Sequence, residues 1–110
     1  METMTEREYS PLNRQLDAFL EKRHPPKTFC PSEVVRALSP AELRVEDVGE
    51  WRDLMPRIRE TIWALRSQGQ LEVLQKGRVL DEHVTLDDLK GPIRVRRIEQ
   101  GEQGGGKQNL

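Results

Sequence analysis

The longest apolar repeat of the chain lies between residues 51 and 68. Its members recur at three- and four-residue steps: Trp51, Leu54, Met55, Ile58, Ile62 and Leu65. This spacing places them on one face of a helix, so it predicts a helix over 51–68 with one buried side. Pro56 is tolerated only near the start of a helix, so the helix either begins near Asp53 or bends around residue 56.

A first helix is predicted over residues 11–23. Ser10 and Pro11 are a typical N-cap and first helical residue. Apolar residues then follow at helical spacing, which indicates an amphipathic helix. The Pro25–Pro26 pair ends it, because the residue before a proline avoids the helical region.

The segment CPSEVVRAL predicts a second helix over residues 31–38. Cys30 is its expected N-cap, and Glu33 stands at the third position, as in a capping box. The SPAE signature that follows has the same form and predicts one extra turn over residues 40–46. Just before this helix, residues 27–29 are long enough for a very short strand.

Alternation of apolar and polar residues predicts two strands, over 70–76 and 93–98. The connection from Gly77 to Gly91 is too long for a tight hairpin, and its five apolar residues suggest packing of its own. Helices followed by a strand pair predict an α+β fold of the winged-helix class. In this class a helix-turn-helix is followed by a C-terminal β wing, here of two or three strands.

Length and composition fit one small domain, which we place at residues 10–98 of the 110. We expect a disordered N-terminus over 1–9 and a flexible, glycine-rich tail over 99–110. No apolar run approaches the roughly 20 residues that span a bilayer. The single cysteine excludes an internal disulfide, so we expect a cytoplasmic protein. The net charge of −1 gives no global signal for nucleic acid, and any such signal depends on how the charges are distributed.

Four segments taken together carry a resemblance: TFCPSEVVRAL, WRDLMPRIR, QKGR and GPIRVRR. They resemble a small bacterial family of winged-helix-like domains of unknown function, over roughly residues 27–97. The linker SPAELRVEDVGE and the wing LDEHVTLDDLK are longer here than in that family. The resemblance implies a winged-helix fold and weakly favours DNA binding. No activity is established for the family, so the resemblance implies none for this chain.

A basic flank of the long helix is the main functional candidate. At 100° per residue, one stripe beside the apolar face holds Arg52, Pro56, Arg59, Trp63 and Arg66. The third helix of a winged-helix protein usually enters the major groove, and Arg and Lys contact phosphates. We therefore predict a nucleic-acid-binding domain, of the kind found in transcriptional regulators. The predicted DNA-contacting residues are Arg52, Arg59, Arg66, Lys76, Arg78, Arg94 and Arg96.

Acidic residues of the wing oppose this interpretation, since carboxylates repel phosphate. They are Asp81, Glu82, Asp87 and Asp88, and the linker before the long helix adds four more. The alternative function is a protein–protein interaction module without DNA binding. In that case Trp63 is an exposed partner-binding anchor, because Trp is enriched at interfaces. The other interpretation of Trp63 is packing against a neighbouring helix or the wing.

No reaction follows from the remaining residues. Cys30 lies at a helix N-terminus, whose positive end stabilises a thiolate, so a thiol-based sensor is a third class. We favour a capping role, because a lone Cys rarely suffices without a paired base. His24 and His83 have no recognised metal-ligand spacing with Cys30. We therefore expect no enzyme activity, no catalytic residue, no cofactor, no metal and no small-molecule substrate, which leaves duplex DNA or another protein as partner.

Overall fold

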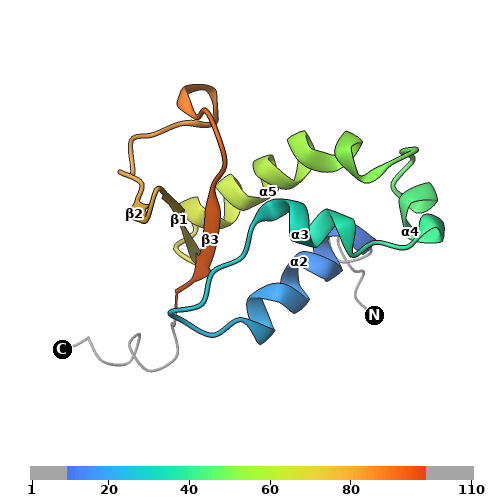
Figure 1. Cartoon of the computed structure of the whole chain (residues 1–110), viewed down its shortest axis with the longest axis horizontal. Helices are drawn as coiled ribbons and strands as arrows, with labels where there is room; N and C mark the ends of the chain where they lie inside the picture. The colour runs from blue at the N-terminus through green and yellow to red at the C-terminus, as the bar shows by residue number, and fades with distance from the viewer. Residues whose placement is uncertain (1–9, 99–110) are drawn as a thin grey trace, which may run out of the picture.

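The helices come first in the chain and the sheet comes last (Figure 1). The computed structural model describes residues 10–98, so the expectations for 1–9 and 99–110 lie outside the described residues. The elements follow in the order α2 (Pro11–Lys22), α3 (Pro31–Arg36), α4 (Pro40–Val45), the 3-10 helix η1 (Trp51–Leu54), α5 (Met55–Ser67), β1 (Leu71–Gln75), β2 (Arg78–Val79), the 3-10 helix η2 (Leu86–Asp88) and β3 (Arg94–Arg97).

The predicted caps determine where the short helices begin. The Ser10 hydroxyl accepts a hydrogen bond from the Asn13 N–H of α2 at 3.2 Å. The Glu33 carboxylate accepts from the Cys30 N–H at 2.9 Å, which satisfies a donor that the first turn of α3 leaves open. The extra turn predicted over 40–46 is α4, with a reciprocal capping box at its start. Both α2 and α3 end one or two residues before the predicted positions.

The long apolar repeat forms two consecutive helices rather than one. The predicted span 51–68 divides into η1 and α5, and Pro56 occupies the second position of α5. The missing N–H of proline costs little there, so the helix starts near Pro56 and does not bend around it. The residues of this repeat that are buried are Leu54, Ile58, Ile62 and Leu65. The chain leaves the helix through Gly69, whose φ of +78° suits glycine.

The sheet is antiparallel with the strand order β2–β1–β3. In the β1–β3 pair, Leu71 lies opposite Arg97 and Val73 lies opposite Val95. Phe29 forms an isolated bridge with Val95 through two backbone hydrogen bonds of 3.0 and 2.7 Å, where the sequence predicts a very short strand. The predicted α+β winged-helix arrangement is confirmed, with a three-stranded sheet at its C-terminal end.

The connection between the two predicted strands of the wing differs from the prediction. The segment Gly77–Gly91 does not connect two strands as one long loop, because its start folds back at once as β2. Gln75 lies opposite Arg78 across a two-residue turn. Lys76 has a φ of +54° and Gly77 a φ of +81°, as a two-residue turn that matches strand twist requires. The wing then passes beside α5 and returns to the sheet as β3.

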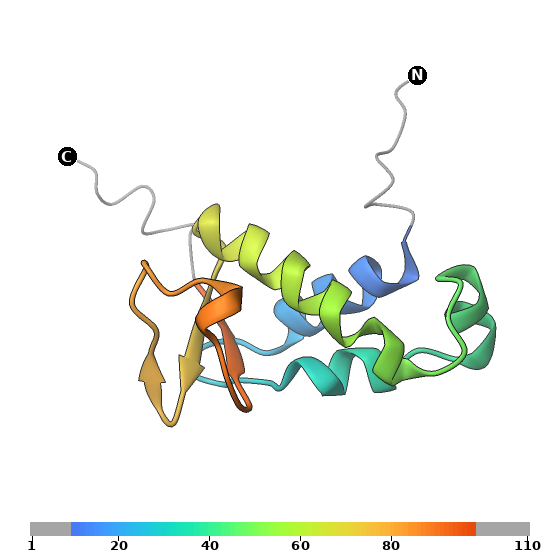
Figure 2. The same cartoon turned by 90° about the horizontal axis from the view of Figure 1, so that it is seen from above.

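The core lies between the helices and the inner face of the sheet. Its buried members are Leu12, Leu16, Phe29, Val34, Val35, Leu38, Leu54, Ile58, Ile62, Leu65, Leu71, Val73, Ile93 and Val95. Seen from above, the wing lies beside the C-terminal part of α5, whereas α4 lies near its other end (Figure 2). Among the helices described, none has the length and apolar character to cross a membrane.

Candidate nucleic-acid interface

The C-terminal half of α5 is fastened to the wing by two side chains of the predicted basic flank. The Trp63 indole N–H donates to the Val84 carbonyl at 3.3 Å. Arg66 donates to the same carbonyl at 3.1 Å and also to the Asp81 carbonyl. The Arg66 guanidinium lies 4.9 Å from the centre of the Trp63 ring. This stacked pair therefore holds the wing loop against the helix.

These contacts change the roles of both residues. We predicted that Arg66 contacts DNA, and in the structure its guanidinium bonds to two carbonyls of the wing loop. Trp63 is half-buried and packs against the core, so its position follows the packing interpretation rather than that of an exposed anchor. A sequence pattern cannot show this, because the carbonyls that Arg66 meets are 15 and 18 residues further along the chain.

The N-terminal part of the flank lies beyond the wing loop. Arg52 has a side chain that is 68% exposed, and it pairs with Glu50 at 3.4 Å. Its guanidinium lies 4.6 Å from the centre of the Trp51 ring, and that of Arg36 lies 5.0 Å from the same ring. Arg36 was not among the residues predicted from the sequence. Its place in the helical pattern indicates only that it is exposed at the end of α3. Arg59 is half-buried, one helical turn before Trp63.

The tip of the wing gathers three cations. Lys76 lies in the β1–β2 turn and Arg78 directly follows it, and both are exposed. The Gln75 side-chain amide donates to the Lys90 carbonyl and, at 3.4 Å, to the Pro92 carbonyl. This bridge brings the Lys90 backbone beside the end of β1, so three exposed basic residues come from neighbouring turns of the wing. Within residues 10–98, no carboxylate forms an ion pair with any of these three side chains. We call these three residues the wing-tip cluster.

The predicted cations of β3 are engaged on the outer face of the sheet. Arg96 forms an ion pair with Glu72 on β1, directly opposite. Arg94 donates to the Thr28 hydroxyl at 3.0 Å and to the Thr28 carbonyl at 3.2 Å. Arg94 also lies 3.8 Å from the Glu33 carboxylate. Of the seven predicted DNA contacts, Arg66, Arg94 and Arg96 therefore have intramolecular roles.

Among residues 10–98, the Glu33 carboxylate is the group whose pKa is clearly shifted. The Cys30 backbone N–H lowers the pKa of Glu33, and partial burial opposes this effect. Arg23 and then Arg94 lower that pKa further by hydrogen bonding and by their charges. The carboxylate therefore stays ionised at neutral pH and keeps both arginines in place.

The acidic residues of the wing are exposed, and half of them bond within the wing. Asp81 accepts from the His83 N–H at 2.8 Å. Asp88 accepts from the N–H and the hydroxyl of Thr85, at 3.2 and 3.0 Å. Glu82 and Asp87 are also exposed. Acid and base are therefore interleaved along the wing, and the basic surface is confined to its tip.

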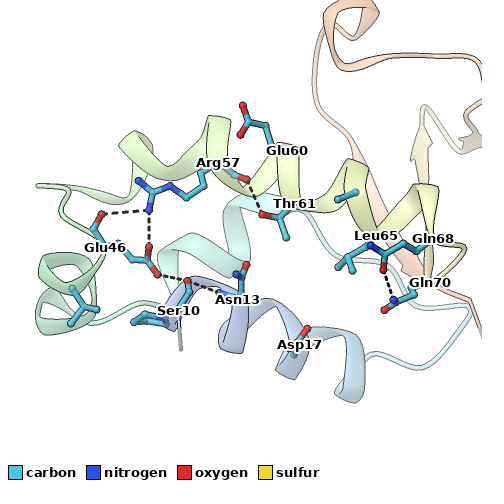
Figure 3. Close-up of a pocket in the computed structure, with 13 residues that line it drawn as sticks. Ser10, Asn13, Asp17, Glu46, Arg57, Glu60, Thr61, Leu65, Gln68 and Gln70 are labelled. Carbon is cyan, nitrogen blue, oxygen red and sulfur yellow. Dashed lines mark hydrogen bonds and ion pairs between the residues drawn. The ribbon is translucent and has the colours of Figure 1, made fainter. Parts of the chain in front are cut away.

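An open groove of about 930 Å³ lies between α2 and α5, away from these residues (Figure 3). Arg57 and Glu46 point towards one another at one end, and a Gln68–Gln70 hydrogen bond of 2.8 Å lies at the other. Glu60 points away from the Arg57–Glu46 pair. None of the seven predicted DNA contacts lines this groove, and it presents both signs of charge.

Cys30 and the histidines form no site of their own in the described region. The Cys30 sulfur lies 3.2 Å from the Ser32 hydroxyl oxygen, and the residue is half-buried as the N-cap of α3. Among residues 10–98, no three His, Cys, Asp or Glu side chains are grouped so that they could hold a metal ion.

Fold and surface together define a winged-helix-like domain with a cationic wing tip. The chain belongs to the family described as "Protein of unknown function (DUF3253)", which it matches over residues 9–98. This match spans the whole described region, and it agrees with the resemblance that the four sequence segments carry. No curated protein matches the chain.

Proposed function

We propose that this domain binds duplex DNA through the wing tip and the N-terminal end of the α5 flank. The observation that carries the proposal is the wing-tip cluster, where Lys76, Arg78 and Lys90 are exposed on neighbouring turns and form no ion pair with a carboxylate among the described residues. Arg and Lys at such a tip neutralise phosphates and release counterions. The exposed Arg52 and the half-buried Arg59 are the helix contacts that remain.

The interface proposed here is smaller than the one expected from the sequence. It omits Arg66, which holds the wing loop, and Arg96, which pairs with Glu72. With few phosphate contacts and acid nearby, non-specific affinity should be weak, with a Kd of about 10⁻⁴ to 10⁻⁶ M or weaker at physiological salt. Each phosphate contact contributes about −0.9 to the slope of log K against log salt, so that slope should be shallow.

Fluorescence anisotropy with a labelled duplex at low salt tests the proposal. The variant Lys76→Glu with Arg78→Glu should lose binding, whereas Arg44→Glu on α4 should bind as the wild type does. Arg44 is an exposed arginine at the other end of the molecule and serves as the matched control. If the wild type binds no duplex at about 20 mM salt, where attraction is least screened, DNA binding is excluded.

A protein-interaction module is the second candidate, and the α2–α5 groove favours it. Val45 on the rim of this groove is 69% exposed, so its apolar side chain is accessible to a partner. A protein partner in this groove would leave the wing tip free. Val45→Asp should then abolish partner binding without changing affinity for DNA, which separates the two candidates.

A further inference from the structure

A second cationic site lies where the α2–α3 connection passes beside β3 (Figure 1). It is an open pocket of about 550 Å³ lined by Arg23, Pro26, Lys27, Thr28 and Arg94. These residues come from two segments that are about seventy positions apart in the chain and are brought together by the Phe29–Val95 bridge. The pocket is within the size range of small-ligand sites.

The two arginines of this pocket are held in fixed positions by the protein. Arg23 donates to the Thr28 carbonyl at 3.3 Å and to Glu33 at 3.1 Å, and it lies 5.0 Å from the centre of the Phe19 ring. Arg94 donates to the hydroxyl and the carbonyl of Thr28. Each guanidinium has five N–H donors, so these bonds leave several donors on both groups for a ligand. Because the two guanidinium groups are already held in place, less side-chain entropy is lost when a ligand binds.

The charges of the pocket are not balanced. Three cations line it, and Glu33 is the carboxylate that contacts Arg23 and Arg94. Within the described residues no ion pair involves Lys27, which is exposed. Three positive charges against one negative charge leave an excess of two. The Thr28 hydroxyl accepts from Arg94, so its own proton is available to a further acceptor.

From this arrangement we infer that the pocket binds a phosphate group. Its excess charge matches a phosphomonoester, which carries about −1.5 to −2 at neutral pH. Guanidinium forks also match the oxygens of phosphate better than an ammonium group alone does. The charge match favours the monoester of a small phosphorylated molecule, whereas the guanidinium donors can also bind the singly charged diester of a nucleic-acid strand. The inference does not depend on DNA binding at the wing tip, because the two sites use different side chains.

Titration of the intact chain with inorganic phosphate tests the inference. Two-dimensional NMR at constant ionic strength should show saturable shifts of the Arg23 and Arg94 Nε–H signals and of the Thr28 amide. Lys27→Gln should weaken phosphate binding about threefold to tenfold, because it removes an exposed charge. Arg23→Gln should weaken it tenfold or more, since a charged hydrogen bond is lost. Arg44→Gln, away from the pocket, should bind phosphate as the wild type does.

The outcomes distinguish the site from its alternatives. No saturable shift at about 50 mM phosphate, where general screening is already strong, would overturn the inference. Unchanged binding in both Lys27→Gln and Arg23→Gln would overturn it as well. If Arg23→Gln fails to fold, the Lys27→Gln variant provides the test, because the Lys27 backbone N–H bond to the His24 carbonyl does not involve the side chain that is replaced. A duplex titration of Lys27→Gln then identifies the source: weaker DNA binding indicates a strand phosphate, and unchanged DNA binding indicates a small phosphorylated molecule.

Discussion

Arg57 of α5 donates to Glu46, the residue that follows α4, with its Nη1 2.7 Å from Oε1. The Glu46 side chain is only 7% exposed, whereas that of Arg57 is 49% exposed. The second carboxylate oxygen accepts from the Ser10 hydroxyl at 2.6 Å and from the Leu12 N–H at 2.8 Å. One buried carboxylate therefore joins the start of α2, the end of α4 and α5 (Figure 3).

We predict that Glu46→Gln lowers the free energy of unfolding by about 1–3 kcal/mol. The amide retains one acceptor oxygen, but its NH₂ group then faces a donor, either Arg57 or the start of α2. Urea denaturation measures the change. Glu60→Gln alters an exposed residue of the same groove and should change stability by less than about 0.5 kcal/mol. Equal stability of these two variants would contradict the role assigned to Glu46.

Glu33 predicts a pH dependence of stability. Its folded pKa lies below the ordinary value of 4.5, so the unfolded chain binds more protons at acidic pH. The stabilisation is therefore fully present above the unfolded pKa and is lost as the pH falls through the folded pKa. The melting temperature of the wild type should exceed that of Glu33→Gln most at neutral pH, and this difference should shrink as the pH falls below 4.5. If the difference in melting temperature between the wild type and Glu33→Gln stays constant across this pH range, the prediction is wrong.

Helix starts could be predicted because their causes are local. The Cys30–Glu33 cap acts over three residues, and the apolar repeat of α5 shows its buried face directly. The β1–β2 turn was missed for a local reason as well. It places Lys76 at positive φ, where Asn or Asp is the usual signal, so the KG pair did not indicate a tight hairpin.

The partners of the arginines could not be predicted, because they are set by the folded chain. Arg94 bonds to Thr28, which is 66 residues away. Arg66 reaches the wing only because the loop returns past α5. The sequence shows that a charged side chain lies on the flank of a helix. It does not show whether that side chain already donates a hydrogen bond to a carbonyl of the same chain. The wing-tip cluster likewise depends on the Gln75 bridge to Lys90.

We predict that Arg66→Gln loosens the wing loop without unfolding the domain. The variant loses the hydrogen bonds to the Val84 and Asp81 carbonyls and the contact with the Trp63 ring. Amide hydrogen exchange should rise around residues 81–85, while exchange in β1 changes little, because local opening differs from global unfolding. Arg59→Gln, two turns earlier on the same flank, is the matched control. If loop exchange is unchanged in Arg66→Gln, the fastening role is wrong.

The β1–β2 turn allows stability and DNA affinity to be separated. Gly77 has a φ of +81°, and an added Cβ would meet no atom within 4 Å, so Gly77→Ala incurs only a conformational cost. We expect that cost to be about 1–2 kcal/mol. Lys76→Asn should instead keep or slightly raise stability, because Asn tolerates the left-handed region at φ +54°.

The same pair of variants should behave in the opposite way towards DNA. Lys76→Asn removes one cation of the wing-tip cluster, so it should weaken duplex binding and make the salt slope shallower by about 0.9. Folded Gly77→Ala keeps all three cations and should bind with near wild-type affinity. Urea denaturation and anisotropy on both variants check the two halves of the prediction. If Lys76→Asn binds duplex as tightly as the wild type, the wing tip does not contact phosphate, and a protein partner in the α2–α5 groove becomes the stronger proposal.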